Sequence, residues 1–122
     1  MKPQVVVSMN AELAQRIRSI LAANEGLAAN KGVVEKPMFG GICFMLNGNM
    51  AVAARRNASL LARVGGKEAE RALTEPGVER MVMRGRPMKD YIVVAADRLG
   101  DAALQKWVGL AIAFAGALPT KD

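Results

Sequence analysis

The sequence predicts an α+β fold: an antiparallel sheet of about five to six strands with an N-terminal helix, a short middle helix and a long C-terminal helix. Two observations indicate it. Apolar residues recur at helical spacing near both ends of the chain, and an Asn-Gly pair separates two apolar runs in the middle. Strands and helices do not alternate as they would in a parallel sheet. We expect residues 1–122 to form a single domain.

The first element is predicted to be a helix over residues 9–24. Its apolar positions follow the helical repeat and line one face, at Leu13, Ile17, Ile20 and Leu21. Ser8 or Asn10 can cap the helix, because their side chains accept hydrogen bonds from the first free backbone N–H groups. Glu12 lies in the first turn, where the helix dipole favours a negative charge.

The strongest local prediction is a β-hairpin over residues 38–55. Residues 42–46 are an uninterrupted apolar run, which predicts a strand inside the sheet with both faces covered. Asn47-Gly48 then supplies the two positive φ angles that a type I′ turn needs. The chain returns antiparallel over residues 49–55, and strand alternation predicts one face made of Met50, Val52 and Ala54.

The remaining strands flank a short helix. We predict them over residues 33–36, 59–64, 78–84 and 91–95. The first of these runs into Pro37, which disfavours a helix and suits an edge strand or a strand end. The short helix covers residues 67–73 and is stopped by Pro76-Gly77. Residues 85–90 contain Gly and Pro and are predicted to form a loop.

A helix over residues 101–118 closes the chain, with Asp101 as its expected N-cap. One face keeps helical spacing, through Leu104, Trp107, Val108, Ala111, Ile112, Ala115 and Leu118. Leu110 and Phe114 fall on other faces, so the helix is apolar nearly all round from Trp107 onward. It is therefore either buried on several sides or packed against a second copy of the chain, and it is too short to span a bilayer.

Composition limits the chemistry. Histidine is absent, which excludes His-based acid–base catalysis, catalytic triads and the usual zinc sites. We expect no catalytic residue, no metal and no cofactor. Cys43 is the only cysteine, so no intrachain disulfide can form, and the N-terminal residues lack the apolar core of a secretion signal. Both features favour the cytoplasm. The eight methionines are expected to fill gaps in an aliphatic core.

Several segments resemble the TfoX N-terminal domain family. The first is Lys36-Pro37-Met38-Phe39-Gly40-Gly41-Ile42-Cys43-Phe44-Met45-Leu46-Asn47-Gly48-Asn49-Met50. Leu61-Ala62-Arg63-Val64-Gly65, then Gly85-Arg86-Pro87-Met88-Lys89-Asp90-Tyr91, and finally Trp107 in the closing helix follow in the family's order. The resemblance covers about residues 10–118, although residues 24–31 form a longer link between first helix and hairpin than is usual in the family.

The resemblance implies a regulatory protein. The family's founding members regulate natural competence in bacteria together with the transcription machinery. They carry a second, C-terminal domain of helix-hairpin-helix character, which we do not expect in this sequence. Most of the family's motif residues are expected to shape the fold, namely Met38, Phe39, Gly40, Gly41, Asn47, Gly48, Gly85, Pro87, Met88, Tyr91 and Trp107.

Two groups of cations are candidate contacts for an anion or a partner. Arg84, Arg86 and Lys89 gather around the predicted loop, where they either clamp a carboxylate or phosphate or remain solvated. A second group would form a basic patch if its strands pair, and consists of Arg55, Arg56 and Arg63. Cys43 lies in an apolar strand with no base available, so packing is expected rather than nucleophilic chemistry.

Three hypotheses remain open from the sequence. The first is a non-enzymatic binding or regulatory module that acts through protein contacts, as a homodimer or with another protein. The second is a basic nucleic-acid-binding module, suggested by the net charge of +6. The third is a small-anion binder that uses residues 84–89. The sequence does not name the partner, the pathway or the oligomeric state.

Overall fold

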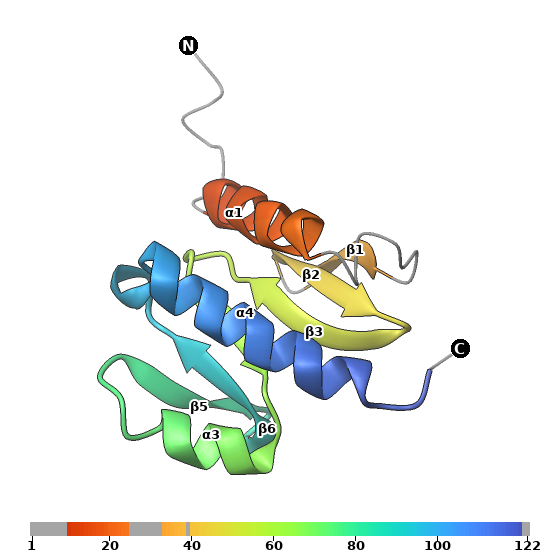
Figure 1. Ribbon diagram of the computed structural model, residues 1–122. Coiled ribbons are helices and arrows are strands. Elements are labelled where there is room, and N and C mark those ends of the chain that lie inside the picture. The colour runs from red at the N-terminus through yellow and green to blue at the C-terminus, as the bar shows by residue number, and fades with distance from the viewer. Residues whose placement is uncertain (1–9, 25–32, 39, 121–122) are drawn as a thin grey trace.

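The α+β prediction is confirmed by the computed structural model, which describes residues 10–24, 33–38 and 40–120 (Figure 1). The strands are β1 (Val33–Met38), β2 (Gly41–Leu46), β3 (Asn49–Ala54), β4 (Leu60–Arg63), β5 (Val78–Met83) and β6 (Arg86–Val94). The helices are α1 (Asn10–Ala23), α3 (Gly66–Ala72) and α4 (Asp101–Gly116), with the 3-10 turn η2 (Ala96–Arg98) before α4. The link over residues 24–31 lies almost entirely outside the described residues.

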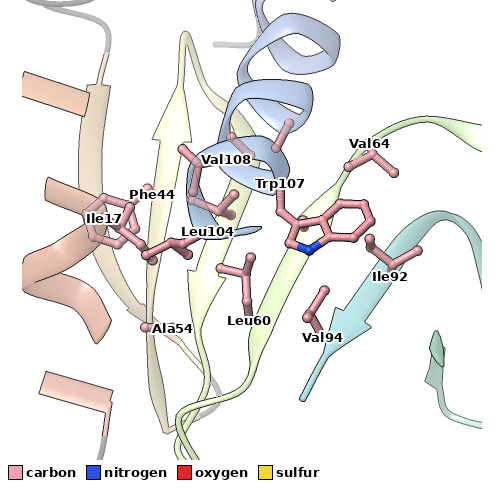
Figure 2. Packing of buried hydrophobic residues seen from close by; sticks show 14 of the residues in the cluster. Ile17, Phe44, Ala54, Leu60, Val64, Ile92, Val94, Leu104, Trp107 and Val108 are labelled. Atoms are coloured by element: carbon pink, nitrogen blue, oxygen red, sulfur yellow. The ribbon is translucent and has the colours of Figure 1, made fainter. Parts of the chain in front are cut away.

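The six strands form one antiparallel sheet in the order β1-β2-β3-β4-β6-β5. The three described helices cover the same face of this sheet, with α1 over β2 and β3, α4 over β2, β3 and β4, and α3 against β6. The main core lies between the helices and that face. In Figure 2, Trp107 of α4 lies beside Val64 and Ile92, and Leu104 lies between Phe44 and Leu60. Trp107 is 3% exposed and belongs to this main core.

Polar contacts from Asn10 and Arg16 help to hold α1 in place. The buried Asn10 side chain donates to the Ala54 carbonyl at 3.1 Å, at the end of β3. Arg16 donates to the Leu99 carbonyl at 2.7 Å and to the Asp101 carboxylate at 3.1 Å. The prediction of Asp101 as N-cap is therefore wrong, because Gly100 occupies that position and Asp101 sits in the first helical turn, where it pairs with Arg16.

The β2–β3 hairpin has the predicted turn, with φ of 53° at Asn47 and 82° at Gly48. The prediction that Met50 shares a face with Val52 is wrong. Phe44 pairs with Val52 but Met45 pairs with Met50, so Ala51 is an extra residue in β3. A β-bulge of this kind reverses the side-chain alternation. It leaves Val52 in the main core and turns Met50 to the opposite face.

The predicted loop over residues 85–90 is also wrong. Arg84 and Gly85 have φ of 54° and 78°, so they alone form a tight turn between β5 and β6. The strand that follows begins at Arg86 and contains Pro87. Proline is tolerated there because β4 pairs with β6 only from Tyr91 onward, so no backbone bond to β4 is lost at Pro87.

The methionines lie in a different place from the one predicted. None of them belongs to the main core cluster among the described residues. Instead, the described methionines lie on the sheet face that no described helix covers, which we call the helix-free face. Met45, Met50 and Met81 pack there around a second, smaller cluster, together with Cys43, Ala53, Leu61, Tyr91 and Val93. Methionine thus marks the one sheet face that no described helix covers.

Candidate binding site on the helix-free sheet face

A pocket of about 660 Å³ opens on the helix-free face of the sheet. All six described strands contribute to it, so it exists only in the folded sheet. We call it the methionine pocket, because five of its lining residues are methionines. Its lining consists of Met38, Gly41, Cys43, Met50, Ala53, Ala54, Arg55, Arg56, Asn57, Leu61, Met81, Met83, Met88 and Tyr91.

The floor and walls of the methionine pocket are apolar and adaptable. Cys43 and Leu61 are buried in the floor, whereas Met50, Met81 and Met88 are half-buried around it. Methionine is unbranched and polarizable, so it fits partners of irregular shape. The volume lies within the range of about 300–1,000 Å³ found for ligand pockets. The arrangement therefore provides a hydrophobic contact surface with little fixed shape of its own.

One end of the methionine pocket is cationic. Arg55 and Arg56 follow β3 directly and line the pocket beside Asn57. The Arg56 guanidinium lies against the backbone of Gly40, where a β-carbon in place of the glycine hydrogen would come within 2.5 Å of its Nη2. Gly40 therefore both reverses the chain at φ 78° and leaves room for this guanidinium. These observations support the predicted role of Gly40 in shaping the fold. Its neighbour Phe39 lies outside the described residues.

Arg63 does not join Arg55 and Arg56, so the predicted patch of three is wrong. Ala54 pairs with Leu60, which places Arg55 at the start of β4, whereas Arg63 ends that strand. Its guanidinium carbon lies 5.5 Å from the centre of the Tyr91 ring and 5.7 Å from that of Phe114. Arg63 thus packs between aromatic rings as a cation–π contact.

Arg84, Arg86 and Lys89 do not line the methionine pocket. Arg84 is in the β5–β6 turn and Arg86 starts β6, both exposed. Lys89 reaches toward Gly66 at the start of α3, on the helix-covered side. The prediction that a loop gathers these three cations is wrong, because that segment is a strand.

The sequence did not reveal the methionine pocket. Its residues come from separated segments of the chain, and the bulge that turns Met50 into it leaves no mark in the sequence pattern. One signal was present: Met81 and Met83 alternate with Arg80, Val82 and Arg84. Such alternation predicts an apolar strand face on the side away from the charges.

Two groups in the pocket resist ionisation. Burial raises the pKa of the Cys43 thiol above its ordinary value. Burial also raises the pKa of Tyr91, an effect that Arg63 opposes and that Asp90 and Cys43 reinforce. Cys43 therefore stays protonated and unreactive near neutral pH, which agrees with the packing role predicted for it.

These shifts predict a loss of stability at alkaline pH. The folded state holds both protons more tightly than the unfolded state does. The unfolded state therefore deprotonates first, and it is stabilised relative to the folded state as pH rises. The free energy of unfolding should be flat to about pH 8 and fall beyond the ordinary thiol pKa of about 8.5. Urea titrations of wild type and Cys43→Ala from neutral to alkaline pH test this. An identical decline in both proteins would show that Cys43 makes no contribution.

The outer face of α4 is a second exposed surface. Gly109, Ala113 and Gly116 are exposed, while Leu110 and Ile112 pack partly against the main core. The helix is thus buried on one broad side by its own chain. The homodimer through α4 stays a prediction.

The described motif residues lie in the sheet, in its turns and in the closing helix: Met38, Gly41, Pro87, Met88 and Tyr91 are in strands, Gly40, Asn47, Gly48 and Gly85 are in turns, and Trp107 is in α4. The sequence matches the TfoX N-terminal domain family over residues 25–115. The chain belongs to this family. No curated protein and no solved structure matches it significantly. In this TfoX N-terminal domain, Gly41, Met38 and Met88 of the family motifs line the methionine pocket, while Trp107 anchors the core on the other face.

Two features are absent from the described residues of this TfoX N-terminal domain, a cluster of metal-ligating side chains and a membrane-spanning helix. No group of three or more His, Cys, Asp or Glu side chains in that part of the chain is arranged to hold a metal ion. Over the same residues, every helix is too short or too polar to cross a bilayer.

Proposed function

We propose that this domain is a non-enzymatic regulatory module that binds a protein partner through the methionine pocket. The observation that carries the proposal is the helix-free sheet face, where five methionines from four strands form an open apolar pocket of about 660 Å³. Soluble monomers rarely leave a contiguous apolar surface of this kind without a partner. The regulatory role of the family's founding members makes the transcription machinery or competence control the proposed setting, in the cytoplasm.

The side chains of the pocket support binding rather than catalysis. The chain contains no histidine, and the only thiol is buried with a raised pKa. Among the described residues, the polar groups that line the pocket are, besides that thiol, two arginines, an asparagine and a tyrosine. Since none of these is an acid–base group with an ordinary pKa near 7, general acid–base chemistry has no evident agent there.

The pocket also supports a protein partner over nucleic acid. Duplex binding depends on cations spread along the phosphate backbone. Two pairs of arginines among the described residues lie apart, with Arg55 and Arg56 at one end of the pocket and Arg84 and Arg86 at the β5–β6 turn. Within the described part of the chain, Tyr91 is the one aromatic residue that lines the pocket, which offers little base stacking.

A peptide-display selection tests the proposal. A random library of about sixteen-residue peptides is selected on the wild-type domain, and bound peptides are titrated by fluorescence anisotropy. Met81→Glu places a charge in the pocket and should weaken binding at least tenfold, since about 1.4 kcal/mol is lost for each factor of ten. Val82→Glu is the matched control, because Val82 is the next residue of β5, is 55% exposed and lies outside the pocket.

Far-UV circular dichroism and urea midpoints establish that both variants are folded. If Met81→Glu does not fold, Met81→Gln takes its place in the binding experiment. Enrichment that Met81→Glu abolishes and Val82→Glu preserves supports the proposal. Enrichment that both variants retain, or none at all, contradicts it. Retention of duplex DNA in a low-salt filter assay, with no peptide enrichment, would favour the nucleic-acid hypothesis instead.

A further inference from the structure

We infer that the partner segment is an amphipathic helix that carries acidic side chains, which pair with Arg55 and Arg56 at the cationic end of the methionine pocket. This inference rests on the proposed function and specifies the chemistry of the partner. It follows from two properties of the pocket: the backbone conformation that a segment bound to its lining can adopt, and the positive charge of Arg55 and Arg56 at one end.

The lining determines the backbone conformation of the partner. The pocket lies on a face of the sheet, where β2, β3, β4 and β6 already pair with strands on both sides. Along these paired stretches the backbone N–H and C=O groups are used within the sheet, and the face of the pocket offers mostly apolar side chains. The free backbone edges lie at the rim, along β1, β5 and residues 86–89 of β6. A bound segment must satisfy its own backbone hydrogen bonds. A helix does so, whereas an extended strand needs a free sheet edge.

The dimensions suit a helix of a few turns. Neighbouring strands lie about 4.8 Å apart, so the four intervals from β2 to β5 span roughly 19 Å. At about 1.5 Å per residue, a helix of about 12 or 13 residues crosses that distance. The three described helices already cover the other face of the same sheet, so the proposed partner would complete a helix–sheet–helix sandwich.

The charges determine which helix fits. Five ion pairs join described residues, and they occupy Arg16, Arg18, Arg71, Arg80 and Lys106. Arg55 and Arg56 have no carboxylate within 4.0 Å among the described residues. The Arg55 guanidinium donates a long hydrogen bond to the Ser59 hydroxyl, at 3.4 Å. Two guanidinium groups at the edge of an apolar surface favour a carboxylate, which Arg binds in a bidentate manner.

A second copy of this chain fits poorly on the same surface. Two copies joined face to face by a twofold axis would bring two methionine pockets together, each with Arg55 and Arg56 at one end. Each chain also carries a net charge of +6. Neither copy supplies a carboxylate from the described pocket lining to neutralise these arginines. An acidic partner of different sequence does supply one.

The experiment uses the peptides selected from the random library described above. Enriched peptides should carry apolar residues at i, i+3, i+4 and i+7 with Asp or Glu at one end, and should gain helical circular dichroism on binding. Arg55→Gln with Arg56→Gln should weaken their binding at least tenfold, because each charge-assisted hydrogen bond is lost. Arg84→Gln with Arg86→Gln is the matched control, since it removes the same charge away from the pocket.

The outcomes separate this inference from the proposed function. A loss confined to the Arg55 and Arg56 variant, with helical acidic peptides, supports the inference. Peptides that need Met81 but bind the Arg55 and Arg56 variant unchanged overturn the inference and leave the proposed function standing. Equal losses in both arginine variants also overturn it, because general charge then explains binding. Saturable binding of dodecanoate without peptide enrichment overturns both and assigns the pocket to a small amphiphilic anion.

Discussion

Trp107→Ala is expected to lower the free energy of unfolding by about 3–5 kcal/mol, the usual cost of truncating a large buried aromatic side chain. Trp107 is 3% exposed and belongs to the main core that joins α4 to the sheet. Its neighbours in that core come from different strands, among them Val64 after β4 and Ile92 of β6 (Figure 2). The surrounding sheet is fixed by backbone pairing, so it can close only part of the cavity left behind.

Urea unfolding followed by far-UV circular dichroism measures this effect, since Trp107 is the only tryptophan and its fluorescence is lost with it. Lys106→Ala is the control. The Lys106 ammonium lies 4.1 Å from the centre of the Trp107 ring and pairs with Glu75 at 3.0 Å, but the residue is exposed. Its loss should cost no more than about 1 kcal/mol. Similar losses in the two variants would show that the ring is not a core anchor.

Gly41→Ala is expected to destabilise the domain by at least about 2 kcal/mol, as overpacking of a fixed site does. A β-carbon at Gly41 would lie 2.5 Å from the Ala54 carbonyl oxygen and 3.2 Å from the α-carbon of Arg55. Both are backbone atoms of a paired strand segment, so neither can move aside cheaply. The strand pair β2–β3 would have to separate at the cationic end of the methionine pocket.

Gly109→Ala is expected to have the opposite effect on stability. Gly109 lies inside α4, and a β-carbon there meets no atom within 4 Å. Alanine at such a helical position should raise stability by about 0.5–1 kcal/mol, because the unfolded chain loses freedom. Thermal and urea unfolding measure the change in the free energy of unfolding for Gly41→Ala and Gly109→Ala. A neutral Gly41→Ala variant would contradict the close backbone approach.

The local signals in the sequence were enough for the fold class because each is a short-range property. The Asn47-Gly48 turn, the helical repeat around Trp107 and the edge-strand Pro37 depend on neighbours along the chain, and the structure confirms all three. The family resemblance carried by the same segments is confirmed as well.

The binding site depends on long-range pairing, and sequence patterns do not report that. The bulge at Ala51 turns Met50 away from the core, and it arises from how β3 pairs with β2. The segment around Pro87 has the composition of a loop, yet it extends β6 because Arg84 and Gly85 complete the turn earlier. Only with both features in place do methionines from distant segments meet on one face.

The functional hypotheses change accordingly. The arginines at 84 and 86 and the lysine at 89 looked like one cluster in sequence, but the strand separates them. Arg55 and Arg56, by contrast, share the methionine pocket with apolar residues of every described strand. The pocket combines an adaptable apolar floor with two guanidinium groups that have no carboxylate partner among the described residues, which is why an acidic amphipathic helix is the best match.

Methyl NMR shows directly whether the helix-free face binds the partner. The domain is labelled at its methionine methyl groups and at leucine and valine methyl groups, then titrated with a peptide from the selection. We predict that the signals of Met50, Met81, Met83 and Met88 shift, whereas those of Leu104 and Val108 in the main core stay in place. Unmoved methionine signals, with shifts of signals from α4 instead, would show that the partner does not bind the helix-free face.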